Sequence, residues 1–165
     1  MLKLPRLLET DSENEILFHT LQKSFRTFSP EGSVKVPHVE LSDNLIQALA
    51  FARRCGTLRG GLENIETVLQ TEEAGLASLR TRKKLKEPNR ISRVLIFSND
   101  GSERFYRHCE ALLHKYGGRV LGIKVNAHST LLGSTFFGKE KSVKALLVNR
   151  KDAVIKVLSA VMSES

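Results

Sequence analysis

The stretch SRVLIFSND, residues 92–100, contains the clearest strand of the sequence and decides the fold class. Four apolar residues run without interruption from Val94 to Phe97, and turn-forming residues follow them. A strand with one solvated face alternates apolar and polar side chains, whereas a continuous apolar run indicates burial on both faces. We therefore predict a central strand with helices packed on both faces of its sheet.

Helical and strand patterns alternate on either side of this strand. The pattern predicts helices over 42–56, 62–70, 100–118, 129–137 and 150–161, and strands over 119–126 and 142–149, with a brief strand at 57–60. Ser42 or Asp43 is the predicted N-cap of the first helix, and Ser129 or Thr130 that of the fourth. This alternation is typical of an α/β domain built as a three-layer α-β-α sandwich.

Two segments lie outside this regular pattern. Residues 1–40 read as an irregular extension with one short helix over 14–25, so the domain itself is predicted to span 41–165. Residues 71–92 stand where a short turn would suffice, and are either an extension of the second helix or a basic insertion. A solvated charged loop and an RNA contact through Arg82, Lys83 and Lys84 both remain open for this segment.

Charge is the strongest signal in the composition. The chain of 165 residues carries 26 Lys and Arg against 18 Asp and Glu, a formal net charge of +8. Residues 1–40 hold five basic and six acidic residues, so residues 41–165 carry the whole excess, 21 against 12. A basic domain attracts phosphate backbones through counterion release. An acidic protein or an anionic membrane surface is the competing partner.

The sequence offers little sign of metal, disulfide or membrane chemistry. Cys55 and Cys109 match no redox or metal spacing, and read as two buried thiols in a reducing compartment. The five histidines are scattered, so we expect no metal site. No apolar run is long enough to span a membrane, and the first residues do not resemble a secretory signal. We expect a location in the cytoplasm or the mitochondrial matrix.

One motif points to nucleotide hydrolysis and fails. GSTFFGKE, residues 133–140, places Gly133, Gly138 and Lys139 as a phosphate-binding P-loop would, but Glu140 replaces the Ser or Thr that ligates magnesium. The predicted order of elements is also wrong, because a strand follows the loop where a P-loop has a helix. No nucleophile motif with a neighbouring base is present either, so we expect no enzymatic activity and no cofactor.

Three stretches together resemble a known superfamily. LAFARRCGTLRGGLENIETVL, VLIFSNDGS and TLLGSTFFGKEKSVKALLV, in this order, are similar to the ribosomal-protein superfamily named for archaeal L-seven-Ae and eukaryotic L-thirty-e, with small bacterial YlxQ-type members nearest. The resemblance covers about residues 41–160. It implies a mixed sheet of about four strands, RNA binding, often to kink-turns, and no catalysis.

The resemblance also implies where RNA is bound. The first place is the loop and first turn of the second helix, with Arg59, Gly60 and Gly61 followed by positions that depart from the family pattern G-x-N-E-x-x-K. Glu63 stands at the Asn position, Asn64 at the Glu position and Thr67 at the Lys position. Glycines let a phosphate approach the backbone, and a helix N-terminus offers unpaired amides. A helix start with no function of its own is the alternative.

The second place implied is the loop before the fourth helix. Its expected contacts are Asn126, His128, Ser129 and Thr130, with Leu131 or Leu132 against an unstacked base and Lys139 and Lys141 beside the RNA backbone. A plain helix cap with core leucines is the alternative.

We expect a structural RNA-binding component of a bacterial or mitochondrial ribosome, acting in translation, or of another ribonucleoprotein. The other functions left open are a ribonuclease P or guide-RNA protein and a protein-interaction module.

Overall fold

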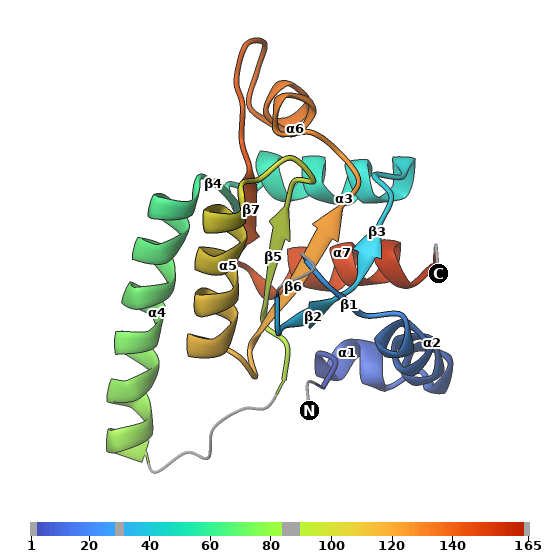
Figure 1. Ribbon diagram of the computed structural model, residues 1–165. Coiled ribbons are helices and arrows are strands. Elements are labelled where there is room, and N and C mark those ends of the chain that lie inside the picture. Colours follow the sequence, from blue (N-terminus) through green and yellow to red (C-terminus); the bar gives the residue numbers. More distant parts are fainter. Residues whose placement is uncertain (1–2, 29–31, 84–89, 164–165) are drawn as a thin grey trace.

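The fold is an α/β sandwich around a mixed sheet (Figure 1). The computed structural model describes residues 3–28, 32–83 and 90–163, and of residues 79–83 it describes the backbone alone. Five described strands form the main sheet in the order β3-β6-β5-β7-β4. β3, β6 and β5 are parallel, and β7 runs antiparallel to both β5 and β4. Their bounds are β3 His38–Val39, β4 Leu58–Gly60, β5 Arg93–Phe97, β6 Val120–Val125 and β7 Ala145–Val148.

The central strand β5 confirms the prediction that its apolar run is covered on both faces of the sheet. Val94 and Ile96 enter one hydrophobic cluster, while Leu95 and Phe97 enter a second cluster on the other face of the sheet. All four side chains are fully buried. Because alternate residues of a strand point to opposite faces, an uninterrupted apolar run is what a doubly covered strand requires.

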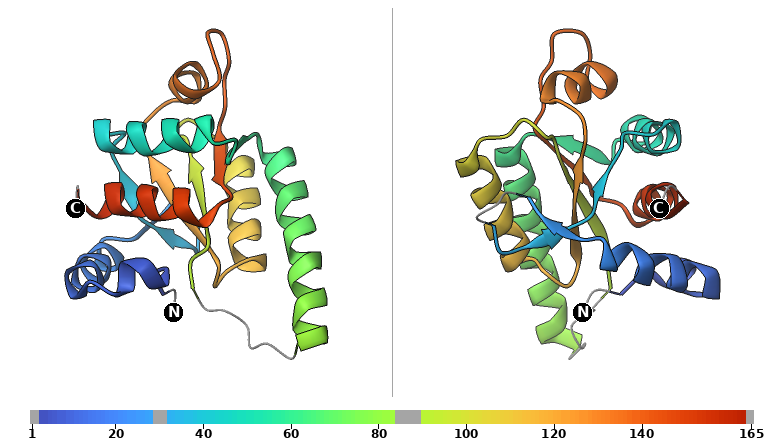
Figure 2. Two further views of the ribbon diagram at one scale, coloured as in Figure 1. Left: turned by 180° about the vertical axis from the view of Figure 1, so that it is seen from behind. Right: turned by 45° about the vertical axis from the view of Figure 1, so that its right-hand side comes forward.

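Four long helices form the two outer layers (Figure 2). α3 (Asp43–Arg54) and α7 (Lys151–Ser163) cover one face, and α4 (Leu62–Lys83) and α5 (Glu103–Lys115) cover the other. The predicted N-cap is confirmed at Ser42, whose side chain accepts a hydrogen bond from the amide of Leu45 at 3.2 Å.

Residues 1–40 are more ordered than predicted. They contain α1 (Arg6–Glu9), α2 (Ser12–Lys23), a two-stranded ribbon of β1 (Arg26–Thr27) and β2 (Lys35–Val36), and β3, which extends the main sheet as a parallel partner of β6. The sequence missed these strands because each has only two residues, too few to show a period. The core includes Leu4, Leu8, Phe18 and Leu21 from this segment.

α4 is longer than the predicted helix, because residues 71–83 continue it. Glu72 anchors this continuation to the sheet by accepting from Arg93 Nε at 3.0 Å and from Arg119 Nη1 at 3.1 Å. Arg119 also donates to Glu73 at 3.3 Å, and its side chain is only 6% exposed. The predicted basic insertion is therefore a helix extension up to residue 83, and residues 84–89 lie outside the described chain.

Two smaller predictions need correction. α6 spans Ser129–Phe136 and its N-cap is His128, not Ser129 or Thr130, because the Ser129 hydroxyl is bonded to Asp100. Of the two cysteines, Cys109 is buried but Cys55 is exposed, since it follows α3 where the chain turns at Gly56.

Candidate nucleic-acid interface

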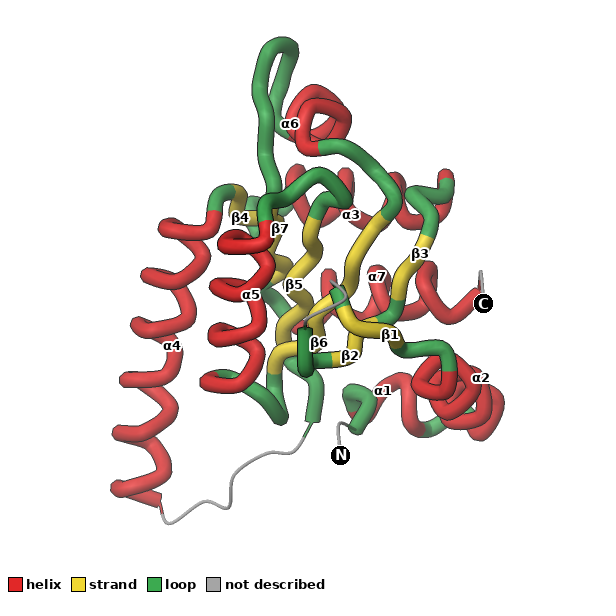
Figure 3. The backbone as a smooth tube through the Cα atoms, in the orientation of Figure 1, coloured by secondary structure: helices red, strands yellow, loops and turns green. Residues whose placement is uncertain are grey.

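The two places predicted to contact RNA lie at the same end of the sheet. β5 and β6 both end there, β7 begins there, and β4 leads there into α4 (Figure 3). The amide of Gly61 donates to the carbonyl of Ala145 at 3.1 Å, and the amide of Ser98 donates to the carbonyl of Lys144 at 2.9 Å. These bonds hold the start of α4 and the loop before β7 beside each other.

The first turn of α4 presents unpaired backbone amides. Gly61 has φ +89°, a conformation that side-chain-bearing residues rarely adopt, and its carbonyl accepts from Ile65 at 3.0 Å. Its own amide is already bonded to Ala145, so Gly61 is not itself a free donor. Within the described residues, no group accepts from the amides of Leu62, Glu63 and Asn64. Three amides at the positive end of a helix can receive a phosphate.

The side chains that follow are exposed but differ in what they can do. Glu63, Asn64 and Thr67 are all exposed on α4. The Thr67 hydroxyl donates to the Glu63 carbonyl at 3.1 Å, so its proton is used within the helix. Asn64 keeps donor and acceptor groups for a base edge. Glu63 is an acceptor alone and suits a base amino group, not a phosphate.

Basic side chains from three parts of the chain lie at the same end of the sheet as this turn. Arg53 of α3 donates from Nε to the Phe136 carbonyl at 3.1 Å, and its guanidinium lies 4.9 Å from the Phe137 ring centre. A Cβ placed on Gly60 would lie 3.0 Å from that same ring, so Arg53, Phe137 and Gly60 are neighbours. We call the exposed cations at this end the basic end surface; they are Arg53, Arg59, Lys139, Lys141 and Lys144.

Arg53 and Lys144 were not among the residues predicted to contact RNA. Arg53 belongs to the last turn of α3, where a cation is commonly explained by the helix dipole. Lys144 directly precedes the buried strand β7 and could equally be a strand-edge residue. Arg53 reaches this surface because the end of α3 packs against the end of α6. No local sequence pattern encodes that contact.

The loop before α6 divides into exposed and structural residues. His128, Thr130 and Leu131 are exposed, Leu131 by 49%. Ser129 is 5% exposed and Leu132 is fully buried, so the interpretation of these two as RNA contacts is replaced by a structural one. Asn126 is exposed, but its amide bonds Asn99 and Glu40.

A shallow hollow lies between α6 and the following loop. It has a volume of about 400 Å³ and is lined by Thr130, Leu131, Ser134, Glu140, Lys141 and Ser142. A Cβ on Gly133 would stand 2.2 Å from the Lys141 carbonyl oxygen, so helix and loop touch through their backbones. The hollow therefore has an apolar side chain, Leu131, and a cation, Lys141, at its rim.

The basic end of α4 is a separate location. Arg82 and Lys83 lie in its last turn, their side chains outside the described structure, and Lys84 lies outside the described residues altogether. α4 has 22 residues, so its last turn is about 30 Å from Gly61 at a rise of 1.5 Å per residue. The structure therefore does not bring Arg82 and Lys83 to the basic end surface.

The near-P-loop stretch forms no phosphate cradle of that type. Gly133 lies inside α6, while Gly138 and Glu140 have positive φ of 122° and 67° in the loop after it. The order is helix, loop and strand, the reverse of a P-loop.

Among the described residues, no three His, Cys, Asp or Glu side chains gather as metal ligands. None of the described helices combines the length and apolar character needed to cross a bilayer.

Comparisons with known proteins leave the family open. Neither a protein-family model nor a curated protein matches this sequence. A solved structure of a Bacillus halodurans protein of unknown function is similar, with a TM-score of 0.50 and 20% identity, over 74% of this chain and 100% of that one. A Giardia lamblia 15.5 kD RNA-binding protein reaches a TM-score of 0.44 and 12% identity, over 74% of this chain and 85% of that one. RNA binding is a property of the Giardia lamblia protein. The present chain shares its fold with the Bacillus halodurans protein.

Proposed function

We propose that this chain is a non-enzymatic protein that binds structured RNA at the basic end surface and the first turn of α4. The observation that carries the proposal is that five exposed cations lie at the same end of the sheet as three unpaired helix amides. Both kinds of group bind phosphate, one through charge and the other through directed hydrogen bonds. Their convergence on one end of the sheet makes a surface for a folded backbone.

The proposed contacts have separate tasks. Arg53, Arg59 and the three lysines neutralise phosphates and supply most of the affinity, which makes binding dependent on salt. Asn64 and Glu63 read base edges, and Leu131 packs against an unstacked base. Because Thr67 brings no charge to the position of the family's lysine, a kink-turn is not required as the target.

We propose further that the protein acts within a ribonucleoprotein, in the cytoplasm or the mitochondrial matrix. A ribosome is the first candidate and would make the RNA ribosomal, with a role in translation. The helices α1 and α2, which carry acidic Glu9, Glu13 and Glu15, would then face neighbouring proteins of the particle. A ribonuclease P or guide-RNA particle is the alternative of the same class.

A protein-interaction module is the second candidate function. The observation that favours it is the acidic character of the exposed first turns of α4, where Glu63 stands one turn before Glu66. Glu66 is paired with His108 at 3.2 Å, which leaves Glu63 to repel a phosphate. The exposed Leu131 suits a protein partner equally well.

Capture of native RNA separates these functions. The full chain would be crosslinked in cells of its source, purified under denaturing conditions, and the attached RNA sequenced. The proposal predicts one structured RNA enriched over total RNA, with crosslinked peptides from residues 59–67 and 128–144. Crosslinks confined to proteins, with no RNA enriched, would support the interaction module and overturn RNA binding.

A further inference from the structure

A second pocket lies at the carboxyl ends of the parallel strands β3, β6 and β5, at the same end of the sheet, and none of the five cations of the basic end surface lines it. Its volume is about 340 Å³, at the lower end of the range of about 300–1,000 Å³ that is usual for small-molecule sites. Ligands of α/β sheets commonly bind beyond the carboxyl ends of parallel strands. The lining residues are Arg26, His38, Val39, Glu40, Asn99, Lys124, Val125 and Asn126.

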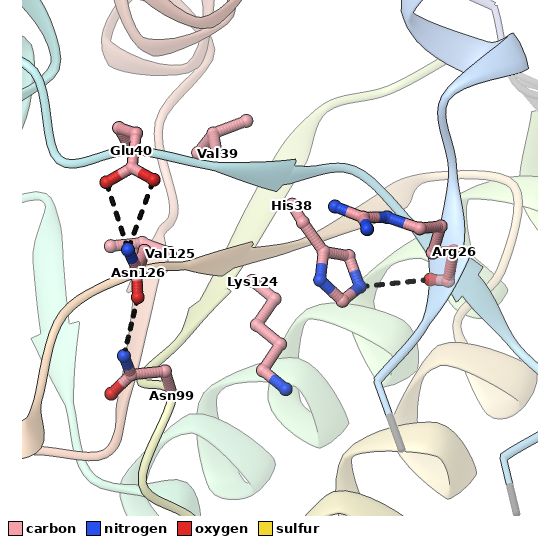
Figure 4. A pocket seen from close by; sticks show the side chains of 8 residues that line it. All are labelled: Arg26, His38, Val39, Glu40, Asn99, Lys124, Val125 and Asn126. Atoms are coloured by element: carbon pink, nitrogen blue, oxygen red, sulfur yellow. Dashed lines mark hydrogen bonds between the residues drawn. The ribbon is translucent and has the colours of Figure 1, made fainter. Parts of the chain in front are cut away.

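The polar groups of the pocket are divided between two sides (Figure 4). Arg26, His38 and Lys124 lie toward one side, and Glu40, Asn126 and Asn99 form a hydrogen-bonded chain on the other. Asn99 Nδ2 donates to Asn126 Oδ1 at 2.8 Å, and Asn126 Nδ2 donates to both Glu40 oxygens at 3.1 Å. One side therefore attracts an anion, and the other offers amide and carboxylate groups to a neutral polar edge.

The cationic side lacks an anion among the described residues. Lys124 Nζ donates to the Phe28 carbonyl at 2.8 Å and lies 4.7 Å from the Tyr106 ring centre, and no described carboxylate pairs with it or with Arg26. Burial lowers the pKa of Lys124. Burial lowers the pKa of His38 too, and the nearby charges of Lys124 and Arg26 add to this effect. A half-buried cation with no counter-ion is costly unless an anion joins it.

We propose that this pocket binds a nucleoside monophosphate unit, with its phosphate between Arg26 and Lys124 and its base edge against Asn126 and Glu40. Val39 and Val125 also line the pocket, but their side chains pack into the hydrophobic cluster on the other face of the sheet, so the sugar and base would rest against the strands between the two polar sides. The amide and carboxylate groups can accept from base amino groups and donate to base acceptors. The unit is either a free mononucleotide or an unpaired nucleotide of a bound RNA, and the second source rests on the proposed function.

Titration of the full-length chain tests the pocket directly. Amide resonances are followed by NMR while AMP, GMP, CMP, UMP, the four nucleosides and inorganic phosphate are added separately. We expect at least one monophosphate to shift the resonances of residues 38–40, 99 and 124–126, and to bind about tenfold tighter than phosphate or its nucleoside. Failure of all four monophosphates to shift these resonances would overturn the proposal, as would equal binding of phosphate alone.

Two variants assign the two sides of the pocket. Arg26→Gln removes an exposed charge and should weaken monophosphate binding about tenfold, the loss of one charge-assisted contact. Arg6→Gln, an equal change of charge on α1, should leave binding unchanged. Asn126→Ala should keep phosphate-dependent binding but bring the four monophosphates to within about threefold of one another. Equal effects of Arg26→Gln and Arg6→Gln would contradict the assignment, and thermal unfolding confirms that each variant is folded.

The same variants distinguish the source of the nucleotide and separate this proposal from RNA binding. If Arg26→Gln weakens RNA binding and monophosphates compete with RNA, the pocket holds a nucleotide of the RNA. If RNA binding is unchanged while monophosphate binding is lost, the ligand is a free nucleotide. Monophosphate binding without any RNA binding would support the pocket and overturn the proposed function. RNA binding without monophosphate binding would support the proposed function and overturn the proposal for the pocket.

Discussion

Asp100 accepts two hydrogen bonds from Ser129, one at each of its carboxylate oxygens. Oδ1 accepts from the Ser129 amide at 3.1 Å, and Oδ2 accepts from the Ser129 hydroxyl at 2.8 Å. Asp100 lies in the loop after β5 and Ser129 is the first residue of α6, so this pair fixes the start of α6 to the neighbouring strand. The Ser129 carbonyl in turn accepts from Val143 at 3.0 Å, which extends the link to the loop before β7.

Removing the Asp100 carboxylate should therefore loosen this end of the sheet. Asp100→Ala leaves the buried hydroxyl and amide of Ser129 without their acceptor and should lower the free energy of unfolding by about 1–3 kcal/mol. Urea denaturation measures the change. Glu103→Ala, an exposed acid in the first turn of α5, should cost under about 1 kcal/mol. Equal losses for the two variants would contradict a special role for Asp100.

The same pair predicts a loss of stability in acid. Burial opposes ionisation of Asp100, but the nearby Ser98 side chain, the two hydrogen bonds from Ser129 and its own amide outweigh burial and hold the pKa of Asp100 below its ordinary value. A lowered pKa in the folded state stabilises the protein above the unfolded-state pKa of about 4, and this stabilisation is lost as the pH falls through the folded-state pKa. The difference in unfolding free energy between wild type and Asp100→Ala should shrink below about pH 4. A difference that does not change with pH would contradict the ionised pair.

The ion pairs of Glu72 should govern the stability of the second half of α4. Glu72→Ala removes a partner of Arg119, whose side chain is 6% exposed, and should cost about 3 kcal/mol. Glu66→Ala breaks the exposed pair with His108 on the same helix and should cost under about 1 kcal/mol. Hydrogen exchange should become faster over residues 72–83 in the first variant alone. Unchanged exchange there would show that other contacts hold the helix.

Gly133 should not accept a side chain. A Cβ at this position would stand 2.2 Å from the Lys141 carbonyl oxygen, so Gly133→Ala must push helix and loop apart and should cost about 1–3 kcal/mol. Gly75 lies in α4 with nothing within 4 Å of a built Cβ, and Gly75→Ala should stabilise the helix by about 0.5–1 kcal/mol. Thermal unfolding of the two variants, measured together, should shift in opposite directions. A stabilising Gly133→Ala would disprove the close approach.

The two cysteines should differ sharply in reactivity. Cys55 is exposed, whereas Cys109 is buried, and burial raises the pKa of its thiol. Because the thiolate is the reactive form, a thiol reagent should label Cys55 rapidly in the native protein and Cys109 only after unfolding. Cys55→Ser should abolish the rapid phase. Rapid labelling that survives in this variant would place Cys109 at the surface.

The sequence predicted those features that local patterns encode. The run from Val94 to Phe97 predicted a doubly covered strand, and the N-cap at Ser42 was found because its partner, the Leu45 amide, is three residues away. Ser129 was misjudged because its partner, Asp100, is 29 residues away and gives no local signal. Likewise, Arg53 reaches Phe136 across 83 residues, so its place on the basic end surface follows from the packing of α3 against α6.

The central claim is that phosphates bind at the basic end surface, and the salt dependence of RNA affinity tests it most directly. The test variant replaces Lys139, Lys141 and Lys144 by Ala; the control replaces Lys23, Lys35 and Lys151, three exposed lysines on other elements, by Ala. The slope of log affinity against log salt should fall by about 0.7–0.9 for each phosphate that the test variant no longer neutralises, and stay unchanged in the control. Equal slopes for wild type and both variants, or RNA affinity that does not respond to salt, would contradict the account.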